Sequence, residues 1–343
     1  EIATDWANFR DELAQRLAEH AGDTEREMDI LREMHHGQVF RLLAQDLAGL
    51  QTIEHLSDHL TELADTIVQE TLPLCWKTIR NRHCETPKFA VIGYGKMGGK
   101  ELGYASDLDM VYLFDDDDQD AGENYNRLGQ RLNTWLSSQT SAGILFETDL
   151  RLRPNGDSGL LAVSVDAFRD YQLKHAWVWE HQALSRARFC AGDPAVGERF
   201  EAIRIEILRQ QRDLTKLREE VIAMRRKMLD AHASHSENEF DLKQDPGGII
   251  DVEFIVQYLV LGFAHQHAEL TGNLGNIALL RIAGELGLIQ QTQAAAVGNA
   301  YREYRRLQHA KRLNANPQAR NDRESLEKHI VAVNQLWQAI FID

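Results

Sequence analysis

Two aspartates, Asp107 and Asp109, are separated by a single residue at the start of the apolar run DLDMVYLF. Residues two apart in a β-strand point to the same face, so both carboxylates would project together. Two neighbouring carboxylates repel each other unless a cation neutralises them. Mg²⁺ commonly binds through one or two carboxylates together with substrate phosphates. A solvent-facing strand end is the alternative for a bare D-x-D, so the interpretation depends on the surrounding sequence.

A glycine-rich turn, GYGKMGGKEL, separates the preceding apolar run FAVI from the aspartates. A strand, a glycine turn and a helix start together offer backbone amides to a phosphate, and Lys96 adds a mobile cation. The P-loop spacing is absent, whereas Gly93, Gly95 and Gly98 satisfy the dinucleotide pattern G-x-G-x-x-G. A dinucleotide site ranks second, because a D-x-D follows in place of a lone acid about 20 residues on.

A third acid comes from the stretch ILFETDLRLRP, residues 144–154. Strand alternation would place two acids and two arginines on one face before the proline ends the strand: Glu147, Asp149, Arg151 and Arg153. A solvated edge strand would look the same. A further carboxylate beside arginines that can clamp a triphosphate is, however, what phosphoryl-type transfer requires. We predict Asp149 as the third metal ligand, with Glu147 as the fallback.

Composition narrows the classes of protein. The 343 residues carry 38 Lys and Arg against 53 Asp and Glu, a formal charge of −15 that repels a nucleic-acid backbone. Three cysteines are an odd number without metal-like spacing and favour a reducing compartment, which we predict to be the cytoplasm: Cys75, Cys84 and Cys190. With no apolar stretch of about 18 residues and no basic-then-apolar leader, neither a membrane span nor a secretory signal is expected.

Helical periodicity on both sides of the motifs indicates an α+β protein that is mostly helical. The sequence divides into three segments: an N-terminal helical segment at 1–70, an α/β domain at 71–165 and a C-terminal helical domain at 166–343. Asp23 or Thr24 can cap a helix, and a further helix is expected near residues 124–138. The acidic run 115–118 does not fit the spacing of a calcium loop and is predicted to be solvated.

The motifs carry a resemblance to a known superfamily. A glycine turn, then Ser106-Asp107-x-Asp109, then a third acid on a later strand resembles the DNA polymerase β-type nucleotidyltransferases, which usually have Gly-Ser where this chain has Gly95-Lys96. The chain is more closely similar to bacterial glutamine synthetase adenylyltransferase, a bifunctional enzyme with two related halves. Four motifs occur in the same order: GYGKMGGKELGYASDLDMVYLFD, DLRLRPNGDSGLL, AWVWEHQALSRAR and DPGGIIDVEFIVQYLV. The last two resemble the C-terminal, adenylylating half, because the adenylyl-removing half usually has a Glu-Arg pair after the tryptophan and Arg in place of Asp251.

The resemblance implies a polymerase β-like nucleotidyltransferase domain, a small mixed sheet with helices, flanked by helical segments and a C-terminal helical bundle. It implies Mg²⁺-dependent transfer of AMP from ATP to a tyrosine hydroxyl of glutamine synthetase, with release of pyrophosphate, in the regulation of nitrogen assimilation. Two Mg²⁺ ions would be held by Asp107, Asp109 and Asp149. The implied partners are glutamine synthetase, a PII-type signalling protein, glutamine and the other half of the same polypeptide.

Further site residues follow from the motifs. The candidates for nucleotide binding are Gly95, Lys96, Gly98, Gly99, Ser106, Arg151 and Arg153. Supporting roles beside the metal ligands are predicted for Glu147, Asp251 and Glu253, although acids at the last two positions would also suit the first turn of a helix. Trp177 and Trp179 are predicted to be core residues rather than nucleotide contacts.

Three alternatives stay open. The chain could be a non-catalytic regulatory half that senses glutamine or a PII-type protein, or it could carry the phosphorolytic adenylyl-removing activity. Transfer to another acceptor, such as RNA or an antibiotic, would use the same chemistry, and the acidic composition argues against RNA. Three converging acids favour an enzyme, because a site without catalysis has no physical need for them.

Overall fold

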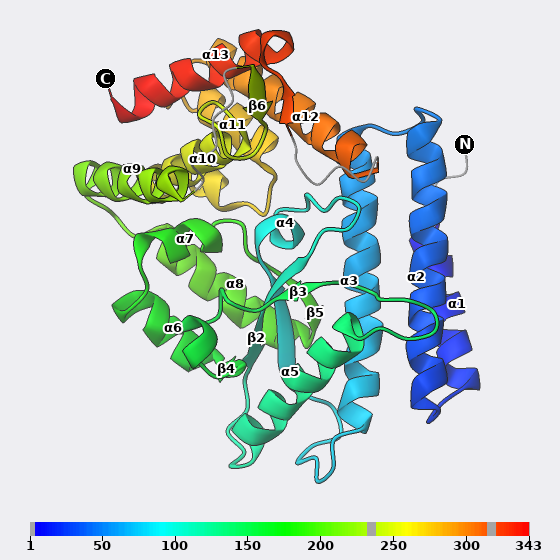
Figure 1. Ribbon diagram of the computed structural model, residues 1–343. Helices are drawn as coiled ribbons and strands as arrows, with labels where there is room; N and C mark the ends of the chain where they lie inside the picture. The colour runs from blue at the N-terminus through cyan, green and yellow to red at the C-terminus, as the bar shows by residue number, and fades with distance from the viewer. Residues whose placement is uncertain (1–3, 232–237, 314–319, 343) are drawn as a thin grey trace. The chain divides into compact units, whose positions relative to one another are not determined.

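The computed structural model describes residues 4–231, 238–313 and 320–342 (Figure 1). The chain forms two compact units: unit 1 comprises Glu1–His175 and Ala187–Ile203, and unit 2 comprises Ala176–Arg186 and Arg204–Asp343. The predicted fold class is confirmed, because the described chain is mostly helical with a small mixed sheet. The predicted division into three segments stays a prediction.

Three helices begin unit 1: α1 (Trp6–Glu19), α2 (Thr24–Leu47) and α3 (Ile53–Lys77). Asp23 is the N-cap of α2, and its carboxylate accepts from the amide of Arg26 at 3.1 Å, as capping requires. Glu27 faces back over the same turn and accepts from the amide of Gly22 at 3.0 Å. The start of α2 is therefore fixed by acids on both sides of the cap.

The sheet of unit 1 is built around β1 (Phe89–Gly93) and β2 (Leu108–Phe114), which pair antiparallel. Both strands are almost wholly buried and read as continuous apolar runs apart from Asp109. The remaining strands of this sheet are β3 (Thr148–Asp149) and β4 (Ala162–Ser164), each parallel to β2, and β5 (Arg188–Gly192), antiparallel to β1.

Helices and aromatic side chains bury this sheet. Unit 1 also contains the one-turn helix α4 (Gly95–Gly98), α5 (Ala121–Ser137) and α6 (Val165–Lys174), while α8 (Pro194–Leu208) runs on into unit 2. Tyr125 of α5 is central: its ring stacks on Trp76 of α3 at 5.5 Å and lies 5.0 Å from Phe114 and 5.8 Å from Phe89. This cluster anchors both helices to the end of the sheet where β1 begins and β2 ends.

Unit 2 is a helical unit with a two-stranded ribbon. Its elements are α7 (Val178–Leu184), α9 (Leu214–Asp230), α10 (Ile249–Phe263), α11 (Asn276–Glu285), α12 (Gln291–Leu313), α13 (Arg323–Phe341), and the antiparallel pair β6 (Glu239–Asp241) and β7 (Arg320–Asp322). Helix α10 is apolar on nearly all sides and is buried along most of its length, so it forms the centre of this core.

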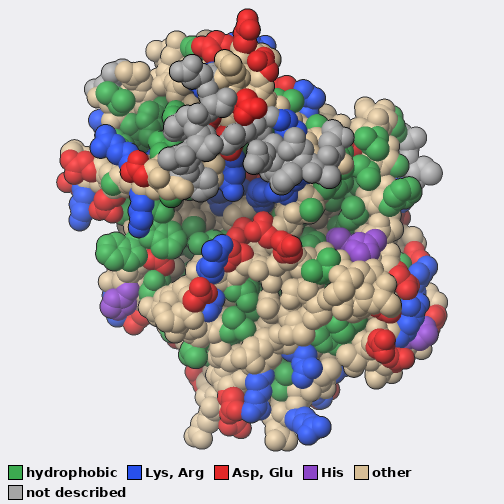
Figure 2. All heavy atoms as spheres, viewed as in Figure 1, with side chains coloured by type: hydrophobic (Ala, Val, Ile, Leu, Met, Phe, Trp, Pro, Cys, Tyr) green, Lys and Arg blue, Asp and Glu red, His purple; other side chains and the backbone are tan. Residues whose placement is uncertain are grey.

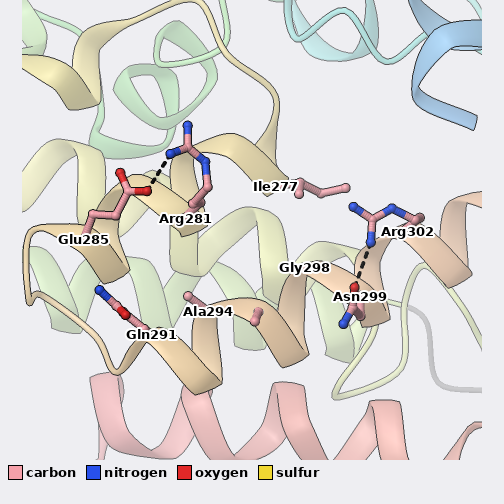
Figure 3. Close-up of a pocket in the computed structure, with 9 residues that line it drawn as sticks. Ile277, Arg281, Glu285, Gln291, Ala294, Gly298, Asn299 and Arg302 are labelled. Carbon is pink, nitrogen blue, oxygen red and sulfur yellow. Dashed lines mark hydrogen bonds and ion pairs between the residues drawn. The ribbon is translucent and has the colours of Figure 1, made fainter.

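A surface groove of about 330 Å³ lies between α11 and α12 (Figure 3). Small residues, Ala294 and Gly298, leave room along α12, and charged side chains stand on its rims. Arg281 pairs with Glu285 on α11 at 2.6 Å, and Arg302 donates to the side chain of Asn299 at 2.7 Å. The groove thus presents both signs of charge within a short distance.

Two sequence-based expectations were wrong about exposure. Trp177 and Trp179 are 68% and 38% exposed, not core residues, because they stand at the start of α7 where the chain turns. Asp116, in the acidic run expected to be solvated, has a side chain only 7% exposed. No helix in the described ranges combines the length and apolar composition needed to cross a membrane.

Candidate active site

Three carboxylates converge at one end of the sheet in unit 1. Asp107 precedes β2, Asp109 lies within it, and Asp149 is the second residue of β3. The parallel register pairs Asp109 directly with Asp149. One carboxylate oxygen from each residue lies within 4.8 Å of the others. Figure 2 shows acidic side chains gathered in the middle of the face, in the region where Figure 1 draws α4 and β3.

The glycine turn lies directly against Asp109 of this acidic cluster. Gly95 has a left-handed backbone (φ +52°), and a β-carbon at this position would lie 2.2 Å from Oδ2 of Asp109. The amide of Tyr94 donates to the carbonyl of Asp109 at 2.8 Å and joins the turn to β2. The amides of Gly98 and Gly99 donate within the turn, to the carbonyls of Tyr94 and Gly95. Only glycine fits position 95, so the turn and the carboxylate form one assembly.

The segment between the turn and Asp107 is tightly folded. Lys100 and Ala105 both have positive φ angles, +54° and +51°, which are unfavourable for residues with a β-carbon. Ser106 is buried, and its Oγ accepts from the amide of Gly103 at 3.0 Å. Ser106 therefore closes the loop that delivers Asp107 to the cluster.

Arg151 folds back onto Asp149 through a turn. Its Nε lies 3.0 and 2.9 Å from the two carboxylate oxygens, and its backbone amide donates to Oδ1 at 2.9 Å. These hydrogen bonds hold the pKa of Asp149 below its usual value and keep it ionised. The predicted strand through residue 153 was wrong, because β3 ends at Asp149 and the chain turns at once.

Arg153 and Glu147 lie in different surroundings. Arg153 donates to the carbonyl of Leu150 at 2.7 Å and faces Asp157 at 3.5 Å, so its guanidinium organises the turn after β3. Glu147 has an exposed side chain, and its carbonyl accepts from the amide of Leu108 at 2.9 Å. It lines a hollow of about 350 Å³ in unit 1 together with Ser106 and residues of α2. Asp149, not Glu147, belongs to the converging cluster.

Asp251 and Glu253 belong to unit 2, on the first turns of α10. The buried carboxylate of Asp251 pairs with Arg225 and accepts from the amide of Gly247 at 2.6 Å. Glu253 accepts from Arg186 at 2.6 Å. Both acids thus join segments of unit 2, and their predicted supporting roles at the metal site stay a prediction.

Two buried arginines, Arg188 and Arg32, hold the segments that carry the site residues. Neither was predicted from the sequence. Arg188 of β5 contacts Asp65 of α3 at 2.7 Å and donates to the carbonyl of Met97 in α4 at 3.1 Å. It therefore ties the glycine turn to α3. The only sequence signal was its place in the motif AWVWEHQALSRAR.

Arg32 of α2 supports the approach to β3. Its guanidinium donates to the carbonyls of Trp135 and Ser138 at the end of α5, at 2.8 and 2.7 Å, and to that of Gly143 at 2.9 Å. The side chain is fully buried. No local sequence pattern distinguishes Arg32 from the many exposed arginines of helices, so its role could not be predicted from the sequence.

The carboxylate cluster fits a hard divalent cation. Asp107 is exposed, Asp109 and Asp149 are half-buried, and all three offer oxygen atoms, which Mg²⁺ prefers. The cluster is open to solvent on the side of Asp107, as a site that also receives substrate phosphates must be. Arg151 is the one described cation on Asp149 and is 74% exposed, so it can swing away without disturbing the core.

Comparison with known proteins matches each part of the chain to a family. Residues 1–203 match the family described as glutamate-ammonia ligase adenylyltransferase, and residues 215–335 match the family described as GlnD PII-uridylyltransferase. The first match ends at the residue where the second segment of unit 1 ends.

Curated relatives extend the match to nearly the whole chain. A bifunctional glutamine synthetase adenylyltransferase/adenylyl-removing enzyme of Aromatoleum aromaticum is 64% identical over 314 residues, 92% of this chain and 33% of the relative. Proteins of the same name from Chromobacterium violaceum and Nitrosomonas europaea are 55% and 54% identical over 99% of this chain and 38% of each relative. The chain therefore spans about a third of the length of these relatives.

Proposed function

Because the chain belongs to the glutamate-ammonia ligase adenylyltransferase family, we propose that unit 1 transfers AMP from ATP to a tyrosine hydroxyl of glutamine synthetase. The observation that carries this proposal is the convergence of Asp107, Asp109 and Asp149 within 4.8 Å of one another against the glycine turn. The reaction forms a bond from the tyrosine oxygen to the α-phosphorus and breaks the bond to the β-phosphate. The electron pair of that bond leaves with pyrophosphate, and the proton of the tyrosine hydroxyl is released to solvent.

The residues of the chain take distinct parts in this reaction. Bound to the three carboxylates, Mg²⁺ would supply positive charge that stabilises the phosphates and acidifies the attacking hydroxyl. Asp109 is held in place from two directions, by the register with Asp149 and by contact with Gly95. Such preorganisation supports catalysis because little reorganisation remains when the substrates arrive.

Arg151 is proposed to change partners. In the structure its guanidinium pairs with the carboxylate of Asp149. If Asp149 held Mg²⁺, the guanidinium of Arg151 would be available to the β- and γ-phosphates instead. Lys96 and Ser106 are proposed to contact the nucleotide from the glycine turn and the loop before Asp107. Gly98 and Gly99 are proposed to shape that turn, and Arg153 to steady the turn that carries Arg151.

Glutamine and a PII-type protein are proposed as regulators. The groove between α11 and α12 supports a small effector with two charges, because arginine and glutamate side chains stand on its rims as an α-amino acid would require. The match of residues 215–335 to a family named for PII uridylylation supports a PII-type partner for unit 2. We place the reaction in the cytoplasm, in accord with three free thiols.

The other outcomes remain open to experiment. A regulatory half without catalysis would keep the fold but transfer nothing. The adenylyl-removing reaction would use the same carboxylates, with inorganic phosphate as the attacking group. The two directions are distinguished by supplying either unmodified synthetase with ATP or adenylylated synthetase with phosphate.

The test incubates the chain with glutamine synthetase, Mg²⁺ and α-labelled ATP, with glutamine and a PII-type protein supplied. The proposal expects label on a synthetase tyrosine, and its loss in the Asp107→Asn plus Asp109→Asn variant. Asp117→Asn is the matched control, since it removes one exposed carboxylate of the acidic run and should transfer normally. Absence of label from the folded chain would overturn the proposal in favour of a regulatory role.

A further inference from the structure

A second group of potential metal ligands lies at the other end of β2. Asp116 follows this strand by two residues, and His83 and Cys84 lie in the connection from α3 to β1. One ligand atom from each of the three lies within 4.8 Å of the others. The seven residues from Asp109 to Asp116 put this group about 20 Å from the acidic cluster. The two groups are therefore separate sites.

The three side chains differ in kind from the acidic cluster. A thiolate, an imidazole and a carboxylate together suit a transition metal such as Zn²⁺, whereas Mg²⁺ prefers oxygen alone. Around one tetrahedral Zn²⁺, the usual bond lengths put ligand atoms about 3.3–3.7 Å apart. Nε2 of His83 and Oδ2 of Asp116 are 3.1 Å apart and would separate by about 0.2 Å. The sulfur of Cys84, which lies within 4.8 Å of both, would close the remaining gap by a side-chain rotation.

Each ligand is held by a neighbour. Nδ2 of Asn124 donates to the carbonyl of Asn81 at 3.3 Å and to Nδ1 of His83 at 3.0 Å, which fixes the ring. The ring proton is then on Nε2, and a zinc ion bound there would displace it. Tyr125 donates to Asp116 at 2.9 Å and lies 3.8 Å from the sulfur of Cys84. The side chains of His83 and Asp116 are only 5% and 7% exposed. The side chains of His83 and Asp116 are therefore held in fixed positions.

Aromatic rings flank the group. The ring centroid of His83 lies 5.8 Å from that of Trp76 and 5.2 Å from that of Tyr125.

We propose that His83, Cys84 and Asp116 bind Zn²⁺, with water as the fourth ligand, and so join the α3–β1 connection to the end of β2. The role proposed for the ion is to connect these two segments, and no reaction is assigned to it. The site clamps the end of the sheet opposite to the acidic cluster and does not depend on the function proposed above.

The test uses Co²⁺ as a spectroscopic substitute for Zn²⁺. The full chain is stripped with a chelator and titrated with Co²⁺. We expect a stoichiometric sulfur-to-cobalt charge-transfer band that disappears when Zn²⁺ is added. The acidic cluster cannot give this band, because it contains only oxygen ligands, and the band should persist in the Asp107→Asn plus Asp109→Asn variant.

Variants assign the band to this site. Cys84→Ser should abolish the band and weaken Zn²⁺ binding by at least about 100-fold, while Cys190→Ala is the matched control and should retain both. Zn²⁺ should also raise the Tm of the unmodified chain and of Cys190→Ala but not that of Cys84→Ser. A folded, unmodified chain that gives no band, or a band that survives in Cys84→Ser, would overturn the proposal.

Discussion

The carboxylate of Asp109 lies so close to the α-carbon of Gly95 that no side chain fits between them. A β-carbon on residue 95 would lie 2.2 Å from Oδ2 and 3.0 Å from Cγ of Asp109, at a φ angle of +52°. The glycine of the turn and the acid of the strand are therefore a single steric unit. The loss of either changes the position of the other.

Gly95→Ala should consequently impair the site although it adds one methyl group. We expect displacement of Asp109, weaker Mg²⁺ binding and a fall in transfer of about 100-fold, since misplacement by about 1 Å costs that much. Isothermal titration with Mg²⁺ and the labelled transfer assay measure the two effects. Gly37→Ala is the control, because a β-carbon there meets nothing within 4 Å and alanine favours the helix. Unchanged transfer in Gly95→Ala would contradict the steric argument.

Arg151→Ala should separate metal binding from nucleotide binding. Without the guanidinium, Asp149 has no described ion-pair partner, so Mg²⁺ should bind more tightly when nucleotide is absent. The KM for ATP should rise by roughly tenfold, because a charge-assisted contact to phosphate is lost. Arg127→Ala removes an exposed arginine that pairs within α5 and should change neither quantity. Equal weakening of both metal and ATP would argue against the exchange of partners.

Arg188 should act as a positioning residue for the glycine turn. Arg188→Met leaves Asp65, whose side chain is only 19% exposed, without its ion-pair partner and should destabilise the protein by about 3 kcal/mol. Removing both partners, in Arg188→Met plus Asp65→Leu, should restore most of that stability. Transfer should nevertheless stay low, because the carbonyl of Met97 has still lost its donor. Urea unfolding measures the stability of each variant, and the labelled assay measures its transfer activity. Full recovery of transfer in the double variant would show that Arg188 has a purely structural role.

Arg32→Lys should lower the stability of the protein although it retains the positive charge. Lysine cannot reach the carbonyls of Trp135, Ser138 and Gly143 at once, and each buried acceptor left without a donor costs about 1–3 kcal/mol. We expect a loss of about 3 kcal/mol in the free energy of unfolding. Arg16→Lys, in an exposed pair on α1, should stay within about 0.5 kcal/mol. A small effect at position 32 would show that the carbonyls find water instead.

His35 should make the protein sensitive to acid. Burial, reinforced by His36, lowers the pKa of His35 to about 3, and the ring packs edge-on against Phe146 at 4.7 Å. The unfolded chain takes up this proton near pH 6.5, so stability is full above that pH and falls as the pH drops from 6.5 toward 3. The slope is about 1.4 kcal/mol per pH unit.

The unfolding free energy at pH 7 and pH 5 measures this contribution. His35→Phe should reduce the loss between the two values by about 2 kcal/mol. His55→Gln is the control, because His55 is exposed on α3 and should leave the loss unchanged. An identical pH dependence in the His35 variant and the unmodified chain would assign the acid sensitivity to other groups.

The sequence by itself determined the features that depend on near neighbours. The two-residue period of a strand predicts that Asp107 and Asp109 lie together. The glycine turn after the apolar strand predicts the close backbone contact that Gly95 makes with Asp109. Helix caps such as Asp23 are likewise local, because the capping oxygen and the amide it accepts are three residues apart. The resemblance of four ordered motifs added the family.

The tertiary structure decided what depends on pairing between distant segments. The register of β2 with β3 selected Asp149. Because β3 ends at that residue, the chain turns Arg151 back onto it, which the simple alternation of a long strand does not predict. Packing of α3 and α5 on the sheet brought His83 and Cys84 to Asp116, more than 30 residues along the chain. Local steric constraints depend on a few consecutive residues and can be predicted from them. Strand register and burial depend on the free energy of packing the whole core, which involves residues far apart in the sequence.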